Sequence, residues 1–359
     1  MSLIGSSRGN LVCVTLIVAA LVSIPSASAQ KSPSSDSAPN FMIGTATGTQ
    51  LSTCPSDPLG VSGTCWGLNI SSCPNPPTLP YDATVKVTSP LGASIGTIIF
   101  LSGATGVQFY DAAFTYGSSV INAVVGAGYT AVQIKYNNTV AGWLTGPATN
   151  GPLDLACLPS TSMQWVYEHI LSTGTPLCAT GNSGGSQQIA YALSQYGLGS
   201  IFSMVEPTSG PELSRIDYGC APEKKYSACA ICGFGTLQES YGINIAETGI
   251  DPAYTGVVEP NGPCYQGVKG STQNASLFHH DSTLSDIYPP TLSFLTAIHF
   301  AFGGQDNSAA IPEGLDWASM ITSATAIVCV PSAGHPLASS QAGATQIEND
   351  LISYCKAKP

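Results

Sequence analysis

Apolar residues along the chain fall into segments of different periodicity. Residues 96–101 form a continuous apolar run of the kind found in strands covered on both faces. Residues 110–127 instead suit a helix, and strand-like and helix-like segments then alternate up to about residue 205. Because strands that alternate with helices form parallel sheets, the pattern predicts a mostly parallel central sheet flanked by helices. Further strands are expected at 84–88, 129–136, 176–180 and 201–205, and further helices at 154–171 and 186–196.

The alternation stops at residues 211–290, which are rich in Gly, Tyr, Cys and Pro and show little periodicity. A structureless loop of that length is uncommon in a compact domain, so we predict a disulfide-braced cap insertion that covers the site. Regular patterns return afterwards, and the core is therefore expected to comprise residues 83–210 and 291–359. Its last elements are predicted as a strand at 297–302, a helix at 313–322, a strand at 324–330 and a helix at 345–356.

Residues 1–29 have the features of a secretory signal peptide. Arg8 supplies a positive charge, residues 11–24 an apolar stretch, and Ala27-Ser28-Ala29 an A-x-A cleavage site. The apolar stretch is too short to anchor the chain in a membrane, and we expect no integral membrane association. The sequence thus predicts a secreted, extracellular protein. Residues 30–82 hold many turn formers and three cysteines, and they are predicted to form a Cys/Pro-rich N-terminal extension.

The cysteines agree with export. The chain has 12 cysteines, and cleavage of the signal would remove Cys13 and leave an odd number. An oxidising compartment predicts about five disulfides and at least one free thiol, with the pairing left open. Cys229 and Cys232 have C-x-x-C spacing, but no second such pair and no histidine pair at zinc-finger spacing accompanies them. We therefore expect no metal there.

Charge and sequons restrict the partners. The formal net charge is −11, and only 9% of residues are charged, so nucleic acid is not expected as a partner. Asparagines 69, 137 and 274 begin N-x-S/T sequons and predict glycosylation. The His-His-Asp run at 279–281 could bind a metal, although a polar cap loop is the preferred interpretation.

One stretch, Gly181-Asn182-Ser183-Gly184-Gly185, carries a chemical signal. It sets a serine in G-x-S-x-G between a strand-like and a helix-like segment. A turn this sharp strains the backbone of its central residue and therefore needs small neighbours. It would expose the Ser183 hydroxyl and place the Gly184 N–H at a helix N-terminus, where an oxyanion is stabilised. A plain Gly/Ser turn is the alternative in a chain with 38 glycines.

Two later residues, an aspartate and a histidine, could act together with Ser183. Asp306 follows the strand predicted at 297–302, and His335 follows the last predicted strand. Glu206, which ends the strand after the serine helix, is the alternative acid, whereas Asp316 lies on a predicted helix and is expected to face solvent. The other histidines fit less well, since they fall on a predicted helix (His169), inside a strand (His299) or in the cap (His279 and His280).

The order Ser183, Asp306, His335 over residues 83–356 resembles the α/β-hydrolase family of serine hydrolases, whose triad follows nucleophile, acid, histidine. The resemblance implies that His335 is the general base and that Asp306 orients it. It also implies an oxyanion hole formed by the N–H of Gly184 and an N–H in the loop 103–105, for which we choose Ala104. That loop lacks the H-G-G-G run of one lipase group.

The family resemblance extends to activity. It implies a serine carboxylic ester hydrolase that works through an acyl-enzyme, needs no organic cofactor or metal, and acts on a small-molecule, lipid or polymer-linked ester. A serine acyltransferase or a peptidase would use the same triad. A non-catalytic secreted binding protein on a hydrolase scaffold is a further alternative.

Overall fold

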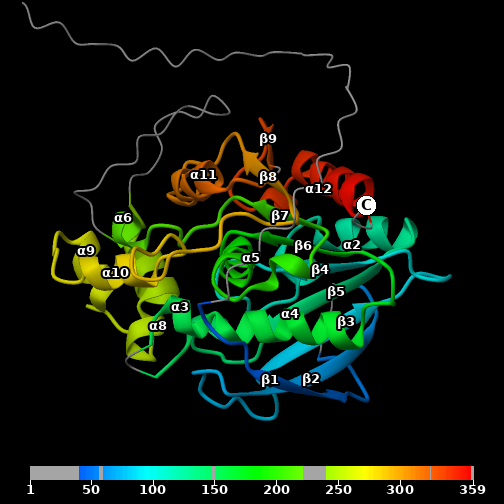
Figure 1. Cartoon of the computed structure of the whole chain (residues 1–359), viewed down its shortest axis with the longest axis horizontal. Helices are drawn as coiled ribbons and strands as arrows, with labels where there is room; N and C mark the ends of the chain where they lie inside the picture. The colour runs from blue at the N-terminus through cyan, green and yellow to red at the C-terminus, as the bar shows by residue number, and fades with distance from the viewer. Residues whose placement is uncertain (1–39, 56–59, 148–149, 221–239, 324, 357–359) are drawn as a thin grey trace, which may run out of the picture. The chain divides into compact units, whose positions relative to one another are not determined.

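A computed structural model describes residues 40–55, 60–147, 150–220, 240–323 and 325–356 (Figure 1). The predicted signal peptide and the Cys229/Cys232 pair lie outside these residues. The described strands form one sheet of nine in the order β1-β2-β3-β5-β4-β6-β7-β8-β9. The strands are β1 (Thr45–Gln50), β2 (Thr64–Ser71), β3 (Ala83–Thr88), β4 (Thr97–Leu101), β5 (Thr130–Tyr136), β6 (Leu177–Asn182), β7 (Met204–Thr208), β8 (Ala297–Gly303) and β9 (Thr325–Val330).

Most of this sheet is parallel. Strands β5, β4, β6, β7, β8 and β9 pair in parallel with one another, whereas β1, β2 and β3 pair antiparallel and β3 joins β5 antiparallel. All five residues of β4 are buried, as expected for a strand covered on both faces. The predicted fold class, a mostly parallel sheet flanked by helices, is confirmed.

Helices cover both faces of the sheet (Figure 1). On one face Ile99 and Leu101 of β4 share a core with α4 (Cys157–His169) and α5 (Gly184–Ser194). On the other face Ile98 and Phe100 share a core with α2 (Gly117–Gly126) and α12 (Gln341–Tyr354). Alternate side chains of β4 thus pack in opposite layers because a strand has a period of two. The other core helices are α1 (Tyr110–Ala113), α3 (Pro152–Leu155) and α11 (Ala310–Met320).

Two segments predicted as single helices are each divided. Residues 110–127 form α1 and α2, which meet so closely that a Cβ at Gly117 would lie 2.4 Å from the Tyr110 carbonyl oxygen. Residues 154–171 likewise fall into α3 and α4, and Pro152 opens α3 as a first-turn proline. Helical periodicity located these segments but did not reveal the breaks, which depend on close backbone approach.

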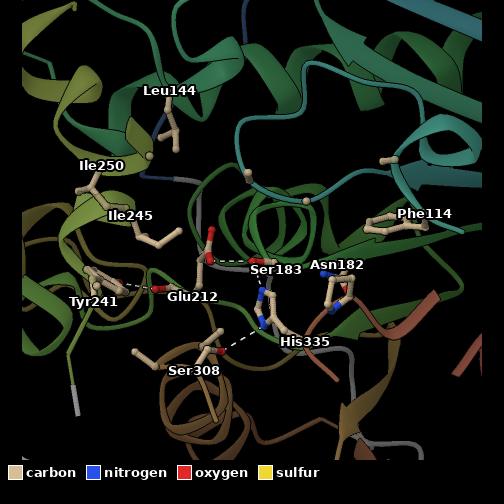
Figure 2. A pocket seen from close by; sticks show the side chains of 18 of the residues that line it. Phe114, Leu144, Asn182, Ser183, Glu212, Tyr241, Ile245, Ile250, Ser308 and His335 are labelled. Atoms are coloured by element: carbon tan, nitrogen blue, oxygen red, sulfur yellow. Dashed lines mark hydrogen bonds between the residues drawn. The ribbon is translucent and has the colours of Figure 1, made fainter. Parts of the chain in front are cut away.

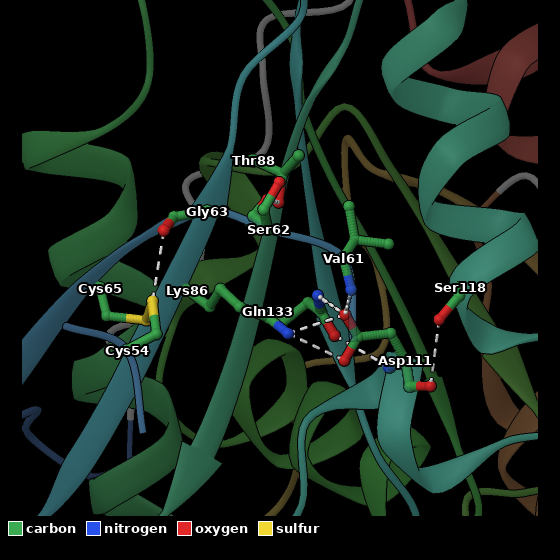
Figure 3. A network of polar contacts seen from close by, with 10 residues as sticks. All are labelled: Cys54, Val61, Ser62, Gly63, Cys65, Lys86, Thr88, Asp111, Ser118 and Gln133. Atoms are coloured by element: carbon green, nitrogen blue, oxygen red, sulfur yellow. Dashed lines mark hydrogen bonds and ion pairs between the residues drawn. A yellow bond between two sulfur atoms is a disulfide. The ribbon is translucent and has the colours of Figure 1, made fainter. Parts of the chain in front are cut away.

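The segment predicted as an N-terminal extension contributes β1 and β2 to the edge of the sheet. Disulfides Cys54–Cys65 and Cys73–Cys157 hold it. A buried polar network joins it further: the Asp111 carboxylate accepts from the Val61 N–H at 2.8 Å and pairs with Lys86 Nζ at 2.7 Å (Figure 3). The turn-rich composition of residues 30–82 did not allow β1 and β2 to be predicted.

Short helices follow β7 in the described part of residues 211–290, the segment predicted as a cap insertion. Cys220–Cys264 links α6 (Ile216–Cys220) to α9 (Pro263–Val268), so the disulfide-braced insertion is confirmed. Tyr191 and Gln187 of α5 hold the far end of the cap, through bonds to the Asp281 carbonyl (2.6 Å) and to Thr283 Oγ1 (2.5 Å). The described cap elements are α6 (Ile216–Cys220), α7 (Ile243–Ile245), the π-helical turn Ala246–Ile250, α8 (Pro252–Thr255), α9 (Pro263–Val268) and α10 (Ala275–Asp281).

A fourth disulfide, Cys178–Cys355, joins β6 to the end of the last helix, and Cys329 is also disulfide-bonded. Within the described ranges, no helix is long and apolar enough to cross a bilayer. The same residues contain no group of three or more His, Cys, Asp or Glu side chains able to hold a metal ion.

Candidate active site

Ser183 lies at the turn between β6 and α5, at the carboxyl edge of the parallel strands. Its backbone has φ 55° and ψ −117°, a strained conformation for a residue with a side chain. The Ser183 N–H donates to the Thr208 carbonyl of β7 at 2.9 Å, which holds the turn against the neighbouring strand. This geometry is the strained strand-to-helix turn that the G-x-S-x-G motif predicts.

Close packing explains the glycines after the serine. A Cβ at Gly184 would lie 1.9 Å from the Ala104 carbonyl oxygen, and one at Gly185 would lie 2.4 Å from the Leu101 carbonyl oxygen. Both positions press α5 against the loop that follows β4. Any larger residue would push the helix away and displace Ser183.

The loops after β8 and β9 lie side by side, and this brings Asp306 and His335 together. The Gln305 N–H donates to the Ala333 carbonyl and the Gly304 N–H to the Val330 carbonyl, each at 2.8 Å. The histidine loop is also tied to the serine turn, since the Leu337 N–H donates to Asn182 Oδ1 at 3.0 Å.

The three predicted residues form a continuous chain of hydrogen bonds. His335 Nε2 lies 2.9 Å from Ser183 Oγ, and His335 Nδ1 lies 2.8 Å from Asp306 Oδ2. The Asp306 side chain is almost fully buried, whereas His335 remains one-third exposed. Ser308, which the sequence did not single out, adds a contact of 3.1 Å from its Oγ to His335 Nδ1, and its N–H donates to Asp306 Oδ1 at 2.9 Å.

The pKa values of Asp306 and His335 are shifted in the directions that favour an ion pair between them. Burial alone would raise the pKa of Asp306, but the hydrogen bond and charge of His335 outweigh it and lower that pKa below its ordinary value. Burial alone would lower the pKa of His335, but Asp306, with a further contribution from Glu212, raises it above the ordinary value. The imidazole is thus made a stronger base.

Glu206, the alternative acid, lies elsewhere. It is fully buried in β7, and neither carboxyl oxygen has a hydrogen-bond partner among the described residues. Burial and then Asp350 raise its pKa well above the ordinary range. A neutral carboxyl group in this position is poorly suited to stabilise an imidazolium. Asp316 lies on α11, as predicted, but it is half-buried rather than facing solvent, and it does not line the cavity over Ser183.

A residue that the sequence analysis missed reaches the serine from the opposite side. Ser183 Oγ donates a hydrogen bond of 2.7 Å to Glu212 Oε2. Glu212 is fixed by its surroundings, because the Leu213 N–H donates to Gln187 Oε1 at 2.6 Å and the Tyr241 hydroxyl donates to the Glu212 carbonyl. The available signal was its place just beyond β7, since ligands in open α/β sheets bind at the carboxyl ends of strands.

The two residues chosen for the oxyanion hole lie against each other. Gly184 opens α5, and its N–H belongs to the group that a helix leaves without internal partners. Ala104 follows β4 with φ 49°, and its carbonyl packs against Gly184. Neither N–H donates a hydrogen bond to another described residue.

A cavity of about 390 Å³ opens over the serine. On one side it is bounded by Phe114, and on the other by Leu144 and the cap residues Ile245 and Ile250 (Figure 2). The lining is largely apolar, and its polar side chains include Glu212 and His335, which contact Ser183. Such a cavity suits a small organic molecule with apolar parts.

The remaining predicted positions lie outside this site. His280 Nδ1 bonds Asp281 Oδ1 at 2.6 Å and His279 pairs with Asp286, so the run 279–281 is engaged in local contacts. Asn69 is exposed on β2, and Asn274 precedes α10. The side-chain nitrogen of Asn137 donates to Tyr81 and Thr84 at 3.0 Å each, and a glycan there would replace one of these bonds.

No known family profile and no curated protein matches the sequence. Solved structures do resemble the chain. A bacterial heroin esterase overlaps 87% of this chain and 85% of its own, with a TM-score of 0.49 at 10% identity. Carboxyl esterase 2 from the fungus Tuber melanosporum overlaps 90% of each chain (TM-score 0.44, 13% identity). Mouse α/β hydrolase domain-containing protein 10 overlaps 77% of this chain and 96% of its own (TM-score 0.46, 14% identity).

The parallel core, the sheet order and the serine turn between β6 and α5 have the arrangement of the α/β-hydrolase fold. A fold of this kind hosts many activities, so a function for this chain has to come from its own site.

Proposed function

We propose that the chain is a secreted serine hydrolase that cleaves carboxylic esters through an acyl-enzyme, with Ser183, His335 and Asp306 as its triad. The observation that carries the proposal is the hydrogen-bonded chain from Ser183 Oγ through His335 to Asp306, with distances of 2.9 and 2.8 Å. The signal-like residues 1–29 and the four disulfides between described cysteines support secretion.

In the first half of the reaction, His335 Nε2 takes the proton of Ser183 as Oγ attacks the ester carbonyl. Asp306 keeps the Nδ1 proton in place and stabilises the imidazolium that forms. The N–H groups of Gly184 and Ala104 would hold the oxyanion. The imidazolium then protonates the departing alkoxide, and an acyl-enzyme remains on Ser183.

In the second half, a water molecule takes the place of the alcohol. His335 accepts a proton from this water as it attacks the acyl carbon, and then returns the proton to Ser183 Oγ as the carboxylic acid leaves. Every proton is exchanged between Ser183, His335, the water and the two products. The chain's own residues therefore supply all the groups that the cycle requires.

The test is labelling of the purified mature protein with a fluorophosphonate probe, followed by mass mapping of the modified peptide. We expect label on Ser183 and none on the Ser183→Ala variant, because only an activated serine reacts with the probe. Folded wild-type protein that takes no label would contradict the proposal and favour a binding protein on this scaffold.

A further inference from the structure

Glu212 is the one acidic residue among the described residues that line the cavity, and no Lys or Arg lines it. Its carboxylate lies 2.7 Å from the oxygen of the proposed nucleophile. It points toward Ser183 from the side of the cap, where Ile245, Ile250 and Leu144 also lie (Figure 2). The triad chemistry above does not use this group.

The hydrogen bonds around Ser183 present a conflict. The hydroxyl has a single hydrogen, yet Glu212 Oε2 and His335 Nε2 both lie within hydrogen-bonding distance of Oγ. An ionised carboxylate can only accept, so the hydroxyl donates to Glu212 when that group is charged. As long as it does so, His335 cannot receive the hydrogen, and attack on a carbonyl is delayed until Glu212 has another donor.

Among the described residues that line the cavity, no Lys or Arg provides such a donor. Burial raises the pKa of Glu212, since a carboxylate in an apolar cavity is poorly solvated. The charge of His335 lowers this pKa, but the serine oxygen lies between the two groups, and the charge of Asp306 behind His335 raises it. A ligand that brings positive charge and N–H donors would therefore stabilise the ionised form of Glu212 over its neutral form.

The position of Glu212 indicates where that charge would lie on the ligand. In the acyl-enzyme the carbonyl carbon is bonded to Ser183 Oγ, so an amino group one carbon farther along is close to Glu212. The leaving oxygen has to lie beside His335 Nε2, which protonates it, and this assigns the amino group to the acyl part. The apolar residues Ile245, Ile250 and Leu144 would receive an apolar side chain on the same carbon.

We propose that Glu212 anchors the α-ammonium group of the substrate, and that the preferred substrates are esters of amino acids with a free amino group and an apolar side chain. The inference rests on the proposed serine hydrolase function. Binding of the ammonium group to Glu212 releases the Ser183 hydrogen to His335, so recognition of the substrate also prepares the nucleophile. A neutral acyl group leaves the hydroxyl on Glu212.

A matched pair of substrates tests this assignment. L-Leucine ethyl ester and ethyl 4-methylpentanoate differ only in the amino group, which is protonated at about pH 6. We divide kcat/KM for the leucine ester by kcat/KM for the neutral ester. This ratio should fall about tenfold or more in Glu212→Gln, because Gln lacks the charge that pairs with the ammonium group. Comparison between variants cancels the different intrinsic reactivities of the esters. Glu247→Gln removes a cap carboxylate that does not line the cavity and should keep the wild-type ratio.

The outcomes separate this inference from the function beneath it. An unchanged ratio in Glu212→Gln, with Ser183 labelled by the fluorophosphonate, overturns the ammonium anchor and leaves the serine hydrolase standing. A labelled Ser183 with neither ester hydrolysed also overturns the anchor alone. Absence of both label and turnover overturns the two together. If the variant does not fold, inhibition of the wild type by leucinamide and by 4-methylpentanamide decides instead, and equal inhibition constants overturn the anchor.

Discussion

At the scale of single residues, Ser183 Oγ is contacted by the imidazole of His335 on one side and by the carboxyl group of Glu212 on the other. His335 is in turn held by Asp306 and Ser308 at the same nitrogen. The burial of Asp306 strengthens its interaction with His335, because water competes little for its carboxylate. The proposed reaction therefore depends on charges that are held in place before substrate binds.

Asp306→Asn should lower kcat by roughly 10⁴-fold, because the amide can leave His335 in the wrong tautomer and removes the charge that stabilises the imidazolium. Steady-state kinetics on an activated ester would measure this loss. Glu206→Gln is the matched control and should retain most activity, since Glu206 has no hydrogen bond to His335. The reverse pattern would transfer the role of triad acid to Glu206.

Glu212→Gln should move the acidic limb of the pH profile of kcat/KM to lower pH on a neutral ester. Glu212 raises the pKa of His335, so loss of its negative charge lowers that pKa. His335 acts as a base only when neutral, and it would therefore become active at lower pH. A limb at the wild-type position, whatever the absolute rate, would contradict this electrostatic coupling.

At the scale of elements, a buried ion pair connects β3, α1 and β5. Lys86 Nζ lies 2.7 Å from Asp111 Oδ2, and Gln133 Nε2 donates to the same oxygen at 2.9 Å (Figure 3). Asp111 also receives the Val61 N–H from the segment before β2. One carboxylate thus joins the N-terminal strands to the layer that carries α1.

Asp111→Ala should destabilise the protein by about 3 to 5 kcal/mol, since it deprives a buried lysine of its carboxylate. Urea unfolding of the purified variant would give the difference in free energy. The double variant Lys86→Met, Asp111→Leu should recover much of the loss, because it removes both charges. A double variant no more stable than Asp111→Ala would show that the hydrogen bonds, rather than the charges, carry the effect.

At the scale of the whole molecule, buried groups of the core link stability to pH. Glu206 is fully buried, and its pKa lies well above the ordinary 4.5. The folded protein therefore keeps a proton that the unfolded chain releases, so stability from this group declines as pH rises above about 4.5. The buried cap residue Asp281, with its pKa raised to about 6 chiefly by burial, acts in the same direction.

Glu206→Gln should reduce the decline in unfolding free energy between about pH 5 and pH 8, because the amide has no proton to release. Urea titrations of wild type and variant at both pH values would measure it. Glu168→Gln, which alters an exposed carboxylate on α4, should keep the wild-type slope. If Glu206→Gln keeps the wild-type slope, the pH dependence of the unfolding free energy comes from other groups.

Much of the fold could be predicted from the sequence because its signals are local. The apolar run at β4, the alternation of strands and helices, and the glycines around Ser183 depend on neighbours a few residues apart. The positions of Ser183, Asp306 and His335, each just after a predicted strand, were equally visible, since parallel strands present their carboxyl ends at one edge. Strands β1 and β2 were not visible, because their turn-rich surroundings hide pairing that only the sheet edge supplies.

By itself the sequence indicated the class of fold and singled out Ser183, Asp306 and His335, through periodicity, turn chemistry and order along the chain. Only the tertiary structure decided which cysteines pair, how Lys86 is neutralised and where Glu212 points. Glu212 follows Ser183 by 29 residues, and Cys355 follows Cys178 by 177. Contacts at such separations leave no periodic trace, because they depend on how completed elements pack against one another.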